Sequence, residues 1–444
     1  MSRAANSKSQ AHNRDKAETR RPALPKQKWV EGTSPEQGVV EVARRALGAR
    51  LELVAHYLPL AARRPEEEIE YVHQLRVATR RAVAALKLFA PLLPRRRAQK
   101  MKKLLGRIRR AAGDARDLDV LGLRLAERWA EWSLDRDEAI SLLRGKARRG
   151  SKGNKGRDAV AANERRGKKQ QGESQRRAAK IEAEVGEKLA VLQRVYTKRA
   201  RAQRPIRQVD RALGGGRFRR RINRLVSRIR WRGEPSEAAP CFGAYARRTL
   251  RPQLERFLTA ARAPRDDLAS LHQFRIEGKR LRYAIEVFAG GLPPACREVL
   301  YPQVEELQER LGTLNDHVTA LVRFQHWNDH QHSRKLIQGC RTQCAFEAAA
   351  LEQCREQFAT WWTPQRAERF ERTFGALLAE PAPDGTSPTS SATTSGTAPL
   401  TEQTAWEENP AERSATPDEA RAAATDASAA RASEPQSSRP PTGR

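Results

Sequence analysis

Apolar residues recur at helical spacing through most of the chain. Between about residues 35 and 379 they stand at i, i+3, i+4 and i+7, with Ala, Leu, Arg and Glu dominating. The alternating pattern typical of strands is nearly absent. These features predict an all-α protein.

Three stretches lack this periodicity and divide the chain. We expect residues 1–34 to form a disordered basic arm and residues 380–444 a disordered tail rich in Ser, Thr, Ala and Pro. Between them we expect one helical domain, 35–379, made of two halves, about 35–143 and 181–379. The halves are separated by a basic insertion, 144–180, which carries 14 Lys and Arg against 3 acids and almost no large apolar residue.

Local signals mark helix ends within this domain. Ser34-Pro35-Glu36 predicts a helix start, because proline suits the first turn of a helix. Gly214-Gly215-Gly216 predicts a turn between two helices of the second half.

An internal repeat is the most informative feature of the sequence. Residues 73–81 (HQLRVATRR) match residues 272–280 (HQFRIEGKR), and residues 113–117 (GDARD) match residues 312–316 (GTLND), all at an offset of 199 residues. A constant offset over this length indicates two homologous halves. We expect them to pack about a pseudo-twofold axis, each half supplying one copy of the same surface.

Each repeated segment predicts a helix with one cationic and one apolar face. Positions three, four and seven residues apart share a face of an α-helix, and such spacing groups the basic residues of each copy. The first copy groups His73, Arg76, Arg80 and Lys87 beside an apolar stripe of Leu75, Ala78, Ala82, Ala85, Leu86 and Phe89. The second groups His272, Arg275, Lys279 and Arg282 beside Phe274, Leu281, Ala284, Ile285 and Phe288. Neighbouring like charges on a helix repel, so these faces are suited to an anion.

The net charge favours a polyanionic partner. The chain carries a formal charge of +32 at pH 7, far from the range of ordinary enzymes. No run of about 18 apolar residues and no apolar signal segment is present. Together with an odd number of cysteines, five, these features predict a cytoplasmic protein without disulfides.

The repeated segments, with the later RDLDV (116–120) and LNDH (314–317), resemble the two halves of the conserved histidine α-helical domain, CHAD. The resemblance covers about residues 36–375. It implies two pseudo-symmetric antiparallel helical bundles around a basic groove or pore that binds inorganic polyphosphate. It also implies association with polyphosphate granules. The chain differs from many family members in its basic insertion and in lacking a triphosphate tunnel domain, so no triphosphate hydrolysis is expected.

The resemblance also implies which residues bind polyphosphate. Carried over position by position, they are His73, Arg76, Arg80, Arg81, Lys87, His272, Arg275, Lys279, Arg280 and Arg282. Weaker candidates lie on the helix that follows the first copy: Lys103, Arg107 and Arg110. The counterpart of that helix carries Glu305, Glu306 and Glu309, which predicts an asymmetric surface. Arg and Lys suit phosphate because one offers a planar fork and the other a mobile point charge.

Other chemistry-bearing residues have simpler interpretations. Asp117 and Asp316 are expected to orient neighbouring groups or cap helices rather than to catalyse a reaction. His326, His330 and His332, with Cys340 and Cys344, match no closed zinc motif, so no metal site is expected.

Two rival functions remain open. Nucleic-acid binding, as the main activity or as a nonspecific secondary one, is compatible with the charge, although the basic faces carry no interleaved aromatic residues. A phosphoanhydride-processing enzyme is the second rival. The sequence contains no Walker-type loop or carboxylate cluster suited to magnesium, so we expect no catalytic residues and no cofactor.

Overall fold

A computed structural model describes residues 28–64, 69–147, 157–233, 239–263 and 267–378. The expected disordered arm lies outside these residues up to residue 27, as do the tail from residue 379 and part of the basic insertion. Within the described residues the protein is all-α, and an isolated antiparallel bridge between Gly38 and Cys241 is the single extended pairing.

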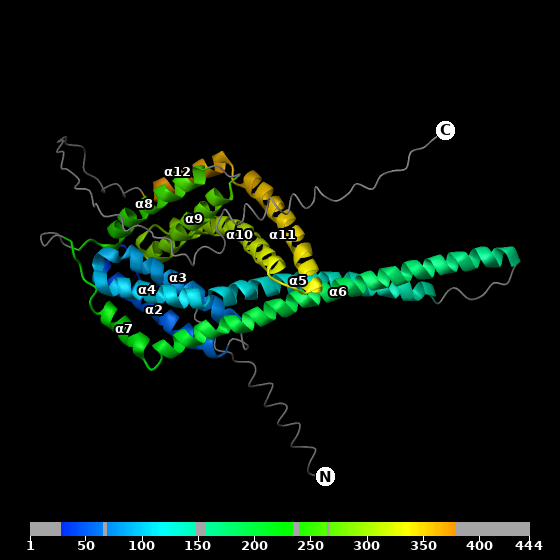
Figure 1. Cartoon of the computed structure of the whole chain (residues 1–444). Coiled ribbons are helices and arrows are strands. Elements are labelled where there is room, and N and C mark those ends of the chain that lie inside the picture. The colour runs from blue at the N-terminus through cyan, green and yellow to red at the C-terminus, as the bar shows by residue number, and fades with distance from the viewer. Residues whose placement is uncertain (1–27, 65–68, 148–156, 234–238, 264–266, 379–444) are drawn as a thin grey trace, which may run out of the picture.

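Figure 1 shows how the helices are arranged along the chain. They are α2 (Val39–Arg63), α3 (Glu70–Leu88), α4 (Arg95–Ala111), α5 (Gly113–Ala147), α6 (Arg157–Leu213), α7 (Arg217–Val226), α8 (Phe242–Arg262), α9 (Leu268–Phe288), α10 (Tyr301–Asp329), α11 (Arg334–Trp361) and α12 (Pro364–Leu378). The short helices η1 (Ala90–Leu92), η2 (Ala289–Gly291) and η3 (Cys296–Leu300) lie between them.

One of the two predicted helix boundaries coincides with a helix end in the structure. The glycine turn separates α6 from α7, and Gly215 and Gly216 adopt positive φ angles of 61° and 73°, a conformation that favours glycine. Asp267 caps α9 by accepting hydrogen bonds of 3.1 Å from the backbone amides of Ala269 and Ser270. The first helix of the described residues, α2, begins at Val39, later than the Ser34-Pro35-Glu36 signal, which instead forms a turn.

The elements of the first part of the chain recur in the second. The helices α3 and α9 carry the two copies of the repeated segment, and η1 and η2 follow them 199 residues apart. The helix α7 packs on α2, and α12 packs on α8. Where the first part has separate helices α4 and α5, the second has η3 followed by one continuous helix, α10.

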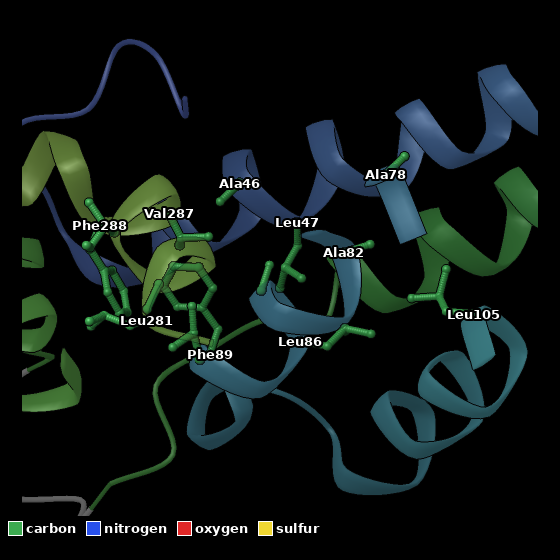
Figure 2. Packing of buried hydrophobic residues seen from close by; sticks show 14 of the residues in the cluster. Ala46, Leu47, Ala78, Ala82, Leu86, Phe89, Leu105, Leu281, Val287 and Phe288 are labelled. Carbon is green, nitrogen blue, oxygen red and sulfur yellow. The ribbon is translucent and has the colours of Figure 1, made fainter. Parts of the chain in front are cut away.

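The predicted apolar stripes form the centre of the main core. Every stripe residue of α3 and α9 is buried, together with Phe89 and Phe288 at their ends. Figure 2 shows Phe89, Leu281 and Phe288 packed together beside Leu47 of α2 and Leu86 of α3. Burying a side chain of this size contributes about 1.5–3 kcal/mol to stability. The apolar face of each repeat therefore fixes the direction of its cationic face.

Two long helices project from the body. In Figure 1, α5 and α6 run side by side beyond α10 and α11, and they pack against one another. The expected limits of the basic insertion, residues 143 and 181, both fall inside these helices. The C-terminal part of α6 returns to the body, where Gln203 donates to the carbonyl oxygens of Ala61 and Ala62 at 2.6 and 3.1 Å.

Among the described helices, none has an apolar stretch long enough to cross a membrane. All five cysteines are free thiols.

Candidate functional site

A cationic cavity of about 1100 Å³ lies between the helices of the two halves. Its walls come from α3, α4, α5 and α6 on one side and from α9 and α10 on the other. The basic side chains that line it are His73, Arg76, Arg80, Lys87, Arg109, Arg110, Arg116, Arg124, Lys198, Arg201, His272, Arg275, Lys279, Arg280, Arg323 and His326. So many cations in one cavity make an anion its natural occupant.

The repeated helices contribute equivalent residues to this cavity. His73 and His272, Arg76 and Arg275, and Arg80 and Lys279 all line it, each pair separated by 199 residues. Because the apolar stripes of α3 and α9 are buried in the common core, the cationic faces of both helices reach the same space. One cavity thus combines the two predicted surfaces.

Burial and mutual repulsion perturb the charges of the central cations. Burial, followed by the charge of Arg80, lowers the pKa of both Arg76 and Arg275 to about 10. Burial and then Arg275 and Arg80 lower the pKa of Lys279 well below its usual range. These cations repel one another where they are partly shielded from water. The repulsion destabilises the unliganded protein and favours binding of an anion.

His73 is neutral near pH 7 in the absence of a ligand. Burial, then the charges of Arg116, Arg80 and Arg76, lower the pKa of its imidazole to about 4, although Glu70 acts in the opposite direction. A polyanion beside this ring would offset the arginine charges and raise the pKa.

The acids of the cavity lie beside its cations. Asp117 Oδ1 is 3.6 Å from Arg76 Nη2, and the negative charge of Asp316 acts on Arg275 and Lys279. The positions of Asp117 and Asp316 are thus compatible with the predicted orienting role. Gly113 leaves room for the Arg76 guanidinium, since a Cβ atom there would lie 3.2 Å from Arg76 Nη1. Arg275 Nε is buried without a hydrogen-bond partner in the described part of the chain.

Two of the implied binding residues lie outside the cavity lining. Arg81 forms a two-point ion pair with the fully buried Glu286, with Nε–Oε2 and Nη2–Oε1 distances of 2.6 and 3.2 Å. Tyr301 donates to the same carboxylate at 2.8 Å. The guanidinium of Arg282 lies over the ring of Tyr283, 5.2 Å from its centroid. Arg280 does line the cavity but also pairs with Glu277.

The weaker candidates on α4 are divided between two surfaces. Arg110 lines the cavity, together with its neighbour Arg109, whereas Lys103 and Arg107 are exposed and outside the lining. The basic face of α4 therefore serves the cavity only at its C-terminal end.

Several cations of the cavity were not found by sequence reasoning. Lys198 and Arg201 come from α6, and Arg323 comes from α10. They gather closely enough that burial, followed by Arg194, Arg201 and Arg323, lowers the pKa of Lys198. Spacing could have grouped Arg194, Lys198 and Arg201 as i, i+4 and i+7 on one helical face. Lys198 and Arg201 have no equivalent in the internal repeat, so nothing singled them out, whereas Arg323 lies 199 residues after Arg124, which also lines the cavity.

A buried polar network supports one wall. Arg124 lines the cavity and donates at 2.8 Å to Glu347 of α11, whose side chain also contacts His317 Nδ1 at 2.6 Å. Burial opposes the charge of Glu347, but the hydrogen bond from His317 and the charge of Arg124 outweigh it and lower the carboxyl pKa. This network connects α5, α10 and α11.

No group of three or more His, Cys, Asp or Glu side chains within the described ranges is placed to hold a metal ion. His326 and His330 lie close, with ring centroids 4.4 Å apart, and His326 lines the cavity.

Comparison with known proteins found one matching family model and similar solved structures. The family model of the CHAD domain matches residues 45–325. A crystal structure of the CHAD domain from the plant Ricinus communis is similar at a TM-score of 0.52 and 21% identity, over 80% of this chain and 98% of that one. PptA from Streptomyces chartreusis is similar at a TM-score of 0.45 and 18% identity, over 75% of this chain and 100% of that one. No curated protein matches the chain.

Proposed function

The chain belongs to the CHAD domain family, and on that basis we propose that it binds inorganic polyphosphate in the cationic cavity and does not catalyse a reaction on it. The observation that carries this proposal is the convergence of three equivalent pairs, His73 with His272, Arg76 with Arg275, and Arg80 with Lys279, on one cavity. In this proposal the two halves of the protein together bind one polyphosphate molecule.

The ligand's chemistry matches the character of the cavity. Polyphosphate presents a dense row of anionic oxygens with no bases or sugars, so a binder needs charge density rather than base readout. Arginines supply forked donors, and Lys87, Lys198 and Lys279 supply point charges. Binding would release counterions and weaken steeply as salt rises, by analogy with other polyelectrolytes.

Nucleic acid suits the cavity less well. Tyr283 and Trp327 line it, but they are only 7% and 4% exposed, so their rings offer little surface for stacking bases. A single, thin polyanion without bases needs no such surface.

The selectivity of the protein among polyanions tests the proposal. Binding of long-chain polyphosphate, single-stranded DNA and RNA of equal total charge is measured at about 150 mM salt, near physiological ionic strength. The cavity variant changes Arg76, Arg80, Arg275 and Lys279 to Ala. A control removes the same charge at exposed positions of α8 and α12 by changing Arg251, Arg366, Arg369 and Arg372 to Ala.

We expect the wild type and the control to prefer polyphosphate, and the cavity variant to lose that preference. Equal affinity for all three polymers, indifferent to the cavity changes, would contradict the proposal. Incubation with magnesium tests the non-catalytic part: polyphosphate should keep its chain length, and release of phosphate or chain shortening would assign an enzyme. In the cell, the proposal places the protein in the cytoplasm at polyphosphate granules, as the family resemblance implies.

A further inference from the structure

A second cationic surface lies on the outside of the first half. We define this outer basic face as the exposed Lys and Arg side chains of residues 95–107, on α4, and residues 217–232, on α7 and the segment after it. Residues 95–107 contain 7 cations in 13 residues, and residues 217–232 contain 8 in 16, with no acid in either stretch. Such a density of one charge sign exceeds what a merely solvated face needs.

The two stretches form one continuous surface. The helices α4 and α7 are in contact, and the segment after α7 lies against the end of η1, just before α4, where the Arg230 amide donates to the Leu92 carbonyl oxygen at 3.2 Å. Arg44 of α2 holds this segment by donating to the Ile229 carbonyl oxygen at 2.8 Å. Figure 1 shows α2, α4 and α7 together at the end of the body away from the projecting helices.

Packing separates this face from the cavity. On α4, Lys100, Lys103 and Arg107 share one exposed helical face that is absent from the cavity lining. On α7, the apolar residues Phe218, Ile222 and Leu225 are buried, which directs Arg220, Arg221 and Arg224 outward.

The fold does not require this charge. The corresponding surface of the second half mixes signs: α12, which packs on α8 as α7 packs on α2, carries Glu368 and Glu371, and Glu371 pairs with Arg262 at 2.6 Å. At the start of α10, Glu306 pairs with Arg310 at 3.0 Å. In the first half, Arg219 pairs with Glu52 of α2 at 3.1 Å, but neither basic stretch itself contains an acid. Like-charged neighbours on a helix are destabilising, so this excess of cations indicates a polyanionic partner.

The side chains of the face narrow the class of polyanion. None of the exposed large apolar residues among those described lies in 95–107 or 217–232, and Trp231, the one ring there that is not buried, is packed against the core, so the face offers little to insert into a bilayer or to stack on unpaired bases. It offers mostly arginine forks, which bind backbone phosphates. Packed helices lie about 8–10 Å apart, and the grooves between the phosphate rows of duplex DNA are about 6 and 12 Å wide. Two rows of cations on touching helices fit such a backbone.

We propose that the outer basic face binds the phosphate backbone of double-stranded nucleic acid without reading its sequence. The proposal is independent of the ligand in the cavity. It gives the protein two polyanion sites, one in the cavity and one on the outer surface, so a single molecule can connect a duplex to the occupant of the cavity.

The test uses the full chain, a random-sequence DNA duplex and an outer variant with Arg220, Arg221 and Arg224 changed to Gln. These changes leave the buried residues of α7 in place, and circular dichroism and the melting temperature serve as checks of folding. The matched control changes Arg366, Arg369 and Arg372 of α12 to Gln. The cavity variant described above is measured beside them.

We expect the outer variant to bind the duplex at least about tenfold more weakly at near-physiological salt, with the slope of log affinity against log salt reduced by up to about three. Its polyphosphate affinity should stay that of wild type, and the α12 control and the cavity variant should keep duplex binding. An unchanged duplex affinity and slope in the outer variant would overturn the proposal. Tighter binding to phosphatidylglycerol vesicles than to the duplex, lost in the outer variant, would overturn it in favour of a lipid partner.

Discussion

Phe89 and Phe288, which occupy equivalent positions 199 residues apart, pack edge to face against each other with ring centroids 5.8 Å apart. Both rings are fully buried, and each also lies near Tyr245 of α8. The two repeated helices therefore meet through their own equivalent residues, and the cavity is built beside this contact.

Removing either ring should destabilise the whole protein. We expect Phe89→Ala and Phe288→Ala each to lower the free energy of unfolding by about 3–5 kcal/mol, because a large buried ring leaves a cavity that the core closes only in part. Urea unfolding measures this. Leu189→Ala serves as the control, since that side chain is 52% exposed and its loss should change stability by less than about 0.5 kcal/mol. A small loss at both phenylalanines would show that the halves do not depend on this contact.

Arg81 should act through stability rather than through ligand binding. Breaking its pair with the buried Glu286 leaves a charge without its partner, so Arg81→Met should cost about 3–5 kcal/mol. The double variant Arg81→Met with Glu286→Met should recover much of that loss, because well-packed apolar residues can replace a buried ion pair. Polyphosphate affinity of the double variant should match wild type. A large loss of polyphosphate affinity in this folded double variant would show that Arg81 takes part in binding.

Repulsion among the cations of the empty cavity should lower the stability of the protein. Replacing Lys279 by Met keeps the volume and removes a repelled charge, so we expect Lys279→Met to raise the free energy of unfolding at pH 7 by about 1–2 kcal/mol while weakening polyphosphate binding. Burial and the nearby arginines lower the pKa of Lys279, so the folded protein loses this proton at a lower pH than the unfolded chain does, and between these two pKa values the unfolded wild type binds more protons. Wild-type stability should therefore rise with pH toward the unfolded pKa of about 10.4, and this rise should be smaller in the variant. Urea titrations at pH 7 and pH 9 test the sign, and a variant less stable than wild type at pH 7 would contradict it.

Polyphosphate binding should tighten as the pH falls below neutrality. With the pKa of His73 lowered to about 4, the free protein carries a neutral imidazole, whereas bound phosphate favours the protonated ring. Affinity should increase from about pH 6.5, the ordinary histidine pKa, toward pH 4, where free His73 also becomes protonated. Over the same range the unliganded protein should lose stability, because the unfolded chain binds this proton more readily. Titrations of wild type and His73→Gln test both trends, and equal pH profiles for the two proteins would show that His73 takes no part.

The sequence predicts the repeated helices well because the periodicity of apolar residues that identifies them lies within each helix. Periodicity identified the buried stripe from Leu75 to Phe89, and the offset of 199 residues identified its copy in α9. Contacts between distant helices were not predictable in the same way. Nothing near Arg81 in the sequence indicates its ion pair with Glu286 on another helix. Lys198 reaches the cavity only because the C-terminal part of the long helix α6 packs against the body. On α4, the local charge pattern could not separate Arg110, inside the cavity, from Arg107 outside it.

The central claim is that both halves form one site, and polyphosphate titrations of half-site variants test it most directly. One variant changes Arg76 and Arg80 to Ala, another changes Arg275 and Lys279 to Ala, and a third combines all four. For one shared site we expect wild-type stoichiometry of one site per protein, loss of affinity in each two-residue variant, and coupling between the pairs that makes the combined loss differ from the sum. Two independent sites per wild-type protein, one of which disappears in each two-residue variant while the other keeps its affinity, would contradict the account.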